Sequence, residues 1–115
     1  MTTFTKVKLS GTGSTGRPIK VVATATAGTL IHTADASALD EVWIYAVNTS
    51  AADVLLTVEF GGVSSPDDLI PVTVPTAGGL IQVVPGVPLL GAAVVRAFAA
   101  SANVINIVGW VNRIA

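Results

Sequence analysis

Short runs of β-branched and other apolar residues, separated by glycine, proline and small polar residues, recur along most of the chain. The clearest run spans residues 39–48, where Val42 and Ile44 alternate with Trp43 and Tyr45. A period of two indicates a β-strand, because successive side chains of a strand point to opposite faces of the sheet. Apolar residues occupy both phases here, so both faces of this strand are predicted to be largely covered.

The same pattern predicts further strands along the chain. Their ranges are 19–27, 29–33, 54–60, 69–74, 80–84, 92–99 and 103–111. The short polar loop between 39–48 and 54–60 predicts an antiparallel hairpin. The Pro-Gly-Val-Pro sequence at 85–88 predicts a turn. Pro71 lacks an amide donor, which places the strand at 69–74 at a sheet edge or makes it begin late.

The alanine-rich stretch 92–102 is the best candidate for a helix. We expect a strand there, because its larger residues alternate and Gly91 and Asn103 bracket the run. Several short strands at a spacing of roughly 8–12 residues indicate a sandwich or a barrel. The predicted fold is therefore an all-β, antiparallel β-sandwich, jelly-roll-like and with about eight strands.

The first residues differ in composition from the rest of the chain. Residues 1–17 are predicted to form a flexible, extended N-terminal arm, followed by a β-sandwich domain over residues 18–115, because 10–16 contains only Gly, Ser and Thr. This run matches the nucleotide-binding pattern G-x-G-x-x-G, but Arg17 and Pro18 follow where that site needs a helix. The flexible arm is the preferred interpretation.

Charge is scarce and unevenly placed. Charged residues make up 11% of the chain, against about 25% in an average soluble domain. A monomer with so few charges would expose much apolar surface, so we expect a homo-oligomer; the alternative is a monomer whose surface is rich in Thr, Ser and Ala. Candidate partner-binding residues in the basic arm are Phe4, Lys6, Lys8 and Arg17.

The net charge of −1 provides no global field that would attract nucleic acid, so we expect no nucleic-acid partner. The longest uncharged stretch, 69–95, exceeds the length of a membrane span. Four prolines interrupt it, however, and would break a helix, so we expect no membrane insertion either.

Candidate chemistry is sparse. The chain has no cysteine and one histidine, His32, which has Asp35, Ser37 and Asp40 nearby in the sequence. A catalytic triad needs a base held between a nucleophile and an acid, and nothing in the sequence fixes these groups. The carboxylates of Asp40, Glu41, Asp53, Glu59, Asp67 and Asp68 are interpreted as solvated loop charges. We therefore expect no catalytic residue, no metal, no cofactor and no enzymatic activity.

The aromatic residues are spread singly along the chain, and most are interpreted as core, with Trp110 as core or interface. Arg96 and Arg113 lie in nearly uncharged strands, where an arginine must find a carboxylate, a carbonyl or an interface. Arg96, Trp110 and Arg113 are therefore the candidate interface residues within the sandwich.

Three stretches, 39–48, 55–62 and 104–114, resemble small virion proteins of tailed bacteriophages. The resemblance implies a capsid decoration or cement protein, bound as a homotrimer to the major capsid protein or another virion protein. It implies that the chain is made in the host cytoplasm, lies on the capsid surface, and stabilises the head by bridging neighbouring capsid subunits. The alternative is a carbohydrate- or host-surface-binding module of a tail fibre or spike.

Overall fold

The computed structural model describes residues 2–13 and 15–115. Strands make up 54% of the chain and helix only 3%, which confirms the predicted all-β class. The elements are β1 (Phe4–Lys8), η1 (Ser10–Thr12), β2 (Ile19–Lys20), β3 (Thr29–Thr33), β4 (Leu39–Asn48), β5 (Val54–Phe60), β6 (Leu69–Val74), β7 (Ile81–Leu89), β8 (Val94–Ala99) and β9 (Ile105–Ile114).

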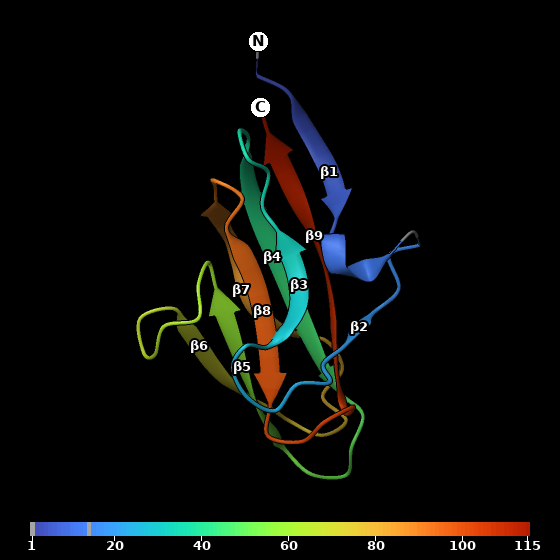
Figure 1. The fold of residues 1–115 in the computed structure, drawn as a ribbon. Helices are drawn as coiled ribbons and strands as arrows, with labels where there is room; N and C mark the ends of the chain where they lie inside the picture. The colour runs from blue at the N-terminus through green and yellow to red at the C-terminus, as the bar shows by residue number, and fades with distance from the viewer. Residues whose placement is uncertain (1, 14) are drawn as a thin grey trace.

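The strands form two antiparallel sheets packed face to face (Figure 1). Sheet A has the order β1-β9-β4-β7, with β2 also pairing with β9, and sheet B has the order β3-β8-β5-β6. The pairs β2·β9, β3·β8, β4·β7 and β5·β6 are those of one long hairpin whose tip lies between β5 and β6. Rolling such a hairpin into two sheets gives a jelly roll, so the predicted sandwich is confirmed.

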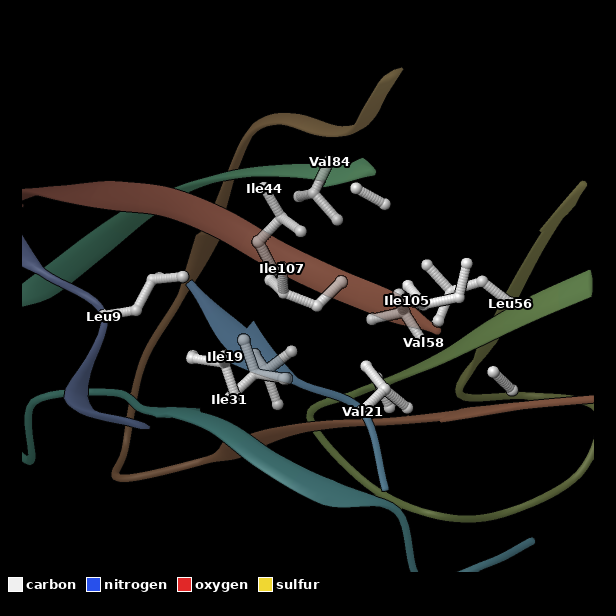
Figure 2. Close-up of a cluster of buried hydrophobic side chains, with 14 of the residues drawn as sticks. Leu9, Ile19, Val21, Ile31, Ile44, Leu56, Val58, Val84, Ile105 and Ile107 are labelled. Carbon is white, nitrogen blue, oxygen red and sulfur yellow. The ribbon is translucent and has the colours of Figure 1, made fainter. Parts of the chain in front are cut away.

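The core lies between the sheets and consists mainly of Val, Ile, Leu and Ala (Figure 2). In β4 every second residue is buried, and Val42, Ile44 and Ala46 have no exposed surface. These side chains pack in one cluster with Ile107 of β9 and Leu56 of the opposite sheet. The other phase of β4, which carries Trp43 and Tyr45, therefore lies on the outer face of sheet A.

The predicted hairpin between 39–48 and 54–60 is wrong. β4 belongs to sheet A, whereas β5 belongs to sheet B. The loop at 49–53 crosses from one sheet to the other. A short polar loop fits either a hairpin or such a crossing, and the sequence pattern does not distinguish them.

The predicted turn at 85–88 is also wrong, because β7 runs through it to Leu89. The strand lies at the edge of sheet A, where a missing amide donor is tolerated on the solvent side. Its register against β4 shifts twice, and Gly86 has a φ of 72°, so the prolines and the glycine are absorbed in an irregular edge strand. Pro71 lies in edge strand β6, as predicted, and 94–99 is a strand, as predicted.

The N-terminal segment differs most from its expected form. Instead of a free arm, β1 pairs along its whole length with β9, and Leu9 is fully buried in the core. Gly11 lies so close to β3 that an added Cβ would come 2.6 Å from the main-chain oxygen of Leu30, so this glycine serves close packing. Met1 and Ser14, also part of the predicted arm, lie outside the described residues.

Candidate functional site

The outer face of sheet A gathers side chains from four strands. Because the registers are known, the residues of this face fall into rows that cross the strands. The rows are Phe4, Ile114 and Leu39; Lys6, Asn112 and Glu41; and Lys8, Trp110 and Trp43. Segments from both ends of the chain and from its middle therefore build one surface.

Aromatic rings form the centre of this face. The ring centroids of Trp43 and Trp110 are 5.8 Å apart with an interplanar angle of 11°, and Tyr45 stacks on Trp110 at 5.8 Å and 20°. The ammonium group of Lys6 lies 5.4 Å from the centroid of Trp110. Gly86 lies against the indole of Trp43, where a Cβ would come 2.6 Å from the ring.

The rings therefore stand on the sheet as a stack that is half-buried. Trp110 stacks with both Trp43 and Tyr45, and Lys6 lies over the same indole. Such contacts contribute about 0.5–1.5 kcal/mol per pair beyond simple burial. The sequence analysis interpreted the two β4 aromatics as core; that is incorrect, because their phase in β4 is opposite to that of the buried residues.

Polar groups next to the rings are engaged in hydrogen bonds. The indole Nε1 of Trp43 donates to Glu41 Oε1 at 2.8 Å, and the amide of Asn112 donates to the same oxygen at 3.0 Å. These two bonds lower the pKa of Glu41 below its ordinary value, and the bond from Asn112 has the larger effect. The amide of Gln82 donates to the hydroxyl of Tyr45 at 3.2 Å.

All three lysines of the chain lie on this side of the molecule. Lys6 and Lys8 are exposed on β1, and Lys20 is exposed on β2, in register with Asn106 of β9. Glu41 belongs to the same face, but it is held by its two donors. This face is therefore basic although the whole chain is slightly acidic.

A second polar cluster lies inside the sandwich. Asp40 is fully buried and accepts hydrogen bonds from Arg113 Nε at 2.8 Å and Arg113 Nη2 at 3.0 Å. His32, also buried, lies with Nε2 2.8 Å from Asp40 Oδ2, while its Nδ1 accepts the main-chain N–H of Ser10 at 3.0 Å. This assigns the ring proton to Nε2. Both ring nitrogens are occupied, so the imidazole offers no free base for catalysis.

Electrostatics in this cluster favour the ionised carboxylate. Burial opposes ionisation of Asp40, but hydrogen bonds from Arg113, His32 and the main-chain N–H of Asp35 outweigh it and lower the pKa of Asp40 from 3.8 to about 2. The interaction with Asp40 raises the pKa of Arg113. The cluster joins β3 of sheet B to β4 and β9 of sheet A, so it fastens one end of the sandwich.

Glu59 is a second fully buried carboxylate, on β5. It accepts a hydrogen bond from the hydroxyl of Thr26 and another from the main-chain N–H of Gly28, both at 2.7 Å. The loop before β3 thus folds over β8 to reach β5, as Figure 1 shows. The interpretation of Asp40 and Glu59 as solvated loop charges is wrong, because both lie inside strands and are buried.

The candidate binding and interface residues lie on different parts of the molecule. Phe4, Lys6, Lys8 and Trp110 come together on the outer face of sheet A, whereas Arg17 is exposed ahead of β2. Arg113 is bound to Asp40 within the chain. Arg96 lies on sheet B and donates to the main-chain oxygen of Gly28 at 3.2 Å. Trp43, Tyr45 and Asn112 were not predicted for this surface; strand alternation places them on one phase of β4 and β9, but only the register shows that they lie side by side.

Over residues 2–13 and 15–115 there is no pocket, no cluster of three potential metal ligands, and no helix long and apolar enough to span a membrane. Comparisons with protein-family models, curated proteins and solved structures find no significant match. We therefore infer the function from the surfaces of this molecule.

Proposed function

We propose that this chain is a structural virion protein of the capsid decoration type, which stabilises a phage head by bridging neighbouring capsid subunits. The observation that supports association is the outer face of sheet A. It combines half-buried tryptophans, exposed lysines and an exposed Phe4, and it has no hollow for a small ligand. Tryptophan and tyrosine are enriched where protein surfaces meet.

The assignment to a virion rests on the resemblance of 39–48, 55–62 and 104–114 to small phage virion proteins. A lattice of identical subunits adds a physical argument, because many weak contacts act together when binding sites repeat. Without a free arm, bridging would use faces of the folded sandwich. A homotrimer on the capsid surface agrees with the scarcity of charge.

The test uses heads assembled from the major capsid protein encoded on the same phage genome. Purified protein is mixed with these heads, and both co-sedimentation and the thermal midpoint of head disruption are measured. The proposal expects saturable binding in fixed proportion to capsid subunits and a raised midpoint. Protein that stays in the supernatant and leaves the midpoint unchanged overturns it. The mass of the free protein in solution tests the trimer separately.

A second candidate function, binding of a carbohydrate on a host surface, is favoured by one observation. Trp43, Tyr45 and Trp110 lie beside Asn112 and Glu41, a combination of rings and polar groups that sugars use. A glycan array would decide: a hit that Trp110→Ala abolishes favours this function over the first.

A further inference from the structure

Strand β1 offers an open sheet edge. The main-chain groups of Thr3 and Ala115 bond to each other in both directions, at 2.8 and 2.9 Å. In an antiparallel ladder such pairs alternate with pairs whose main-chain groups point away. The register then directs the N–H and C=O of Thr5 and Val7 to β9. Those of Phe4, Lys6 and Lys8 point outward.

The same three residues also present their side chains to the outer face of sheet A. Phe4 is 71% exposed, and Lys6 and Lys8 are exposed beside Trp110. Within the described residues no other strand pairs with β1. An extended segment could therefore add to this edge and meet a row of side chains in the order aromatic, cation, cation.

We propose that the β1 edge binds an acidic extended segment of a partner protein by strand addition, with carboxylates of the segment facing Lys6 and Lys8. This rests on the proposed function, for which it names the docking edge and the chemistry of the partner. Main-chain hydrogen bonds give affinity in this binding mode, and alternate side chains give specificity.

Charge complementarity selects the occupant. Opposite charges in directly facing positions stabilise a strand pair by about 0.2–1 kcal/mol, and like charges destabilise it. Lysines on an edge strand therefore disfavour pairing with basic strands, and they are a common protection against uncontrolled pairing. The same lysines favour a strand that carries carboxylates at alternate positions.

A second copy of this chain fits the edge poorly. An antiparallel pairing of two β1 strands about Lys6 would place the two Lys6 side chains opposite each other. The adjacent carboxylates Asp67 and Asp68 lie in the loop before β6, outside any long extended segment, and Asp68 is partly buried and accepts the main-chain N–H of Ser64. The acidic strand should therefore come from another protein.

The probe is a nine-residue peptide of alternating threonine and glutamate. A second peptide has the same composition with its glutamates in one block, and a third has lysine in place of glutamate. Binding is titrated at low salt through the emission of the stacked tryptophans Trp43 and Trp110 and by NMR. We expect the alternating acidic peptide to bind at least tenfold more tightly than the other two.

Hydrogen exchange separates strand addition from simple attraction of charges. The bound acidic peptide should slow exchange of the amides of Phe4, Lys6 and Lys8, which are free of β9. The amide of Lys20 should not change. Equal binding of the alternating and the block peptide, or unchanged exchange at the three β1 amides, overturns strand addition, and so does a lack of binding.

Two sets of variants complete the test. The double variant Lys6→Glu, Lys8→Glu should lose tenfold or more in affinity for the acidic peptide and gain affinity for the lysine peptide. Lys20→Glu, a single charge reversal of the same kind away from this edge, should stay within twofold. Lys6→Pro removes an outward N–H of β1 and keeps the hydrogen bonds to β9. It should therefore bind the acidic peptide more weakly than Lys6→Gln, which also lacks the charge, while the two variants have equal thermal stability.

The same variants are then tested on phage heads. If heads bind the wild type and the double variant equally, the docking edge is wrong while the proposed function stands. If the peptide results are as expected but heads bind neither protein, the virion function is wrong and the edge still recognises acidic strands. Loss of head binding in the double variant alone supports both.

Discussion

Replacing Asp40 by asparagine tests the buried cluster directly. The substitution keeps the shape but removes the charge that Arg113 and His32 both contact. Asp40 has a pKa of about 2 in the folded protein against an ordinary value of 3.8. Since one pKa unit corresponds to about 1.36 kcal/mol, ionised Asp40 contributes roughly 2.5 kcal/mol of folding free energy at neutral pH.

The sign of the pH dependence follows from the lowered pKa of Asp40. Its contribution is complete above the unfolded value of 3.8 and is lost as the pH falls through about 2. At pH 7, Asp40→Asn should cost about 2.5–4 kcal/mol, because it also leaves buried donors without their acceptor. As the pH falls from 7 to 2, the difference in unfolding free energy between wild type and Asp40→Asn should narrow by about 2 kcal/mol.

The measurement is urea unfolding followed by tryptophan fluorescence at pH 7, 3 and 2. Asp67→Asn is the matched control, because Asp67 is exposed in a loop and the same chemical change there should stay within about 0.5 kcal/mol. A loss below about 1 kcal/mol at pH 7 would refute the reasoning. The reasoning would also be refuted if the difference in unfolding free energy between Asp40→Asn and wild type did not vary with pH.

Three further substitutions test how the sandwich is held together, all by the same urea unfolding. Leu9→Ala should cost about 2–5 kcal/mol because Leu9 is fully buried, and a cost near zero would mean that the N-terminal segment is not part of the core. Glu59→Leu should cost about 1–3 kcal/mol, since it leaves the buried N–H of Gly28 without its acceptor; unchanged stability contradicts this. Gly109→Ala should destabilise by more than 1 kcal/mol or so, because its Cβ would collide with the main-chain oxygen of Trp43, and a neutral result would show that the two strands can separate there.

The sequence was sufficient to predict the fold class because strand alternation is strong in this chain. In 39–48 and 94–99 the alternating pattern coincides with the alternating burial of β4 and β8. Pro71 marked an edge strand for a local reason, the missing donor, that holds in any topology. Such local patterns do not depend on which strands pair, so they predict the folded structure correctly.

Long-range pairing was not predictable from the same pattern. The partner of β4 is β9, more than fifty residues away, and the short loop to β5 favoured the wrong neighbour. The sequence 10–16 looked flexible, yet Gly11 is packed against β3. Asp40 looked solvated because Arg113 lies 73 residues further along the chain, and the sequence does not show that the nearby His32 points toward the same carboxylate.

The rolled hairpin also has a consequence for how the chain folds. The tip pair β5·β6 closes a loop of a few residues, whereas β2·β9 joins segments more than eighty residues apart. Closing a long loop costs more chain entropy, and each inner pair shortens the loop that the next pair must close. Topologies rich in distant contacts fold in milliseconds to seconds. Pairing should therefore proceed outward from the tip, so that β1 and its exposed edge are the last part of the sheet to form and the first to open.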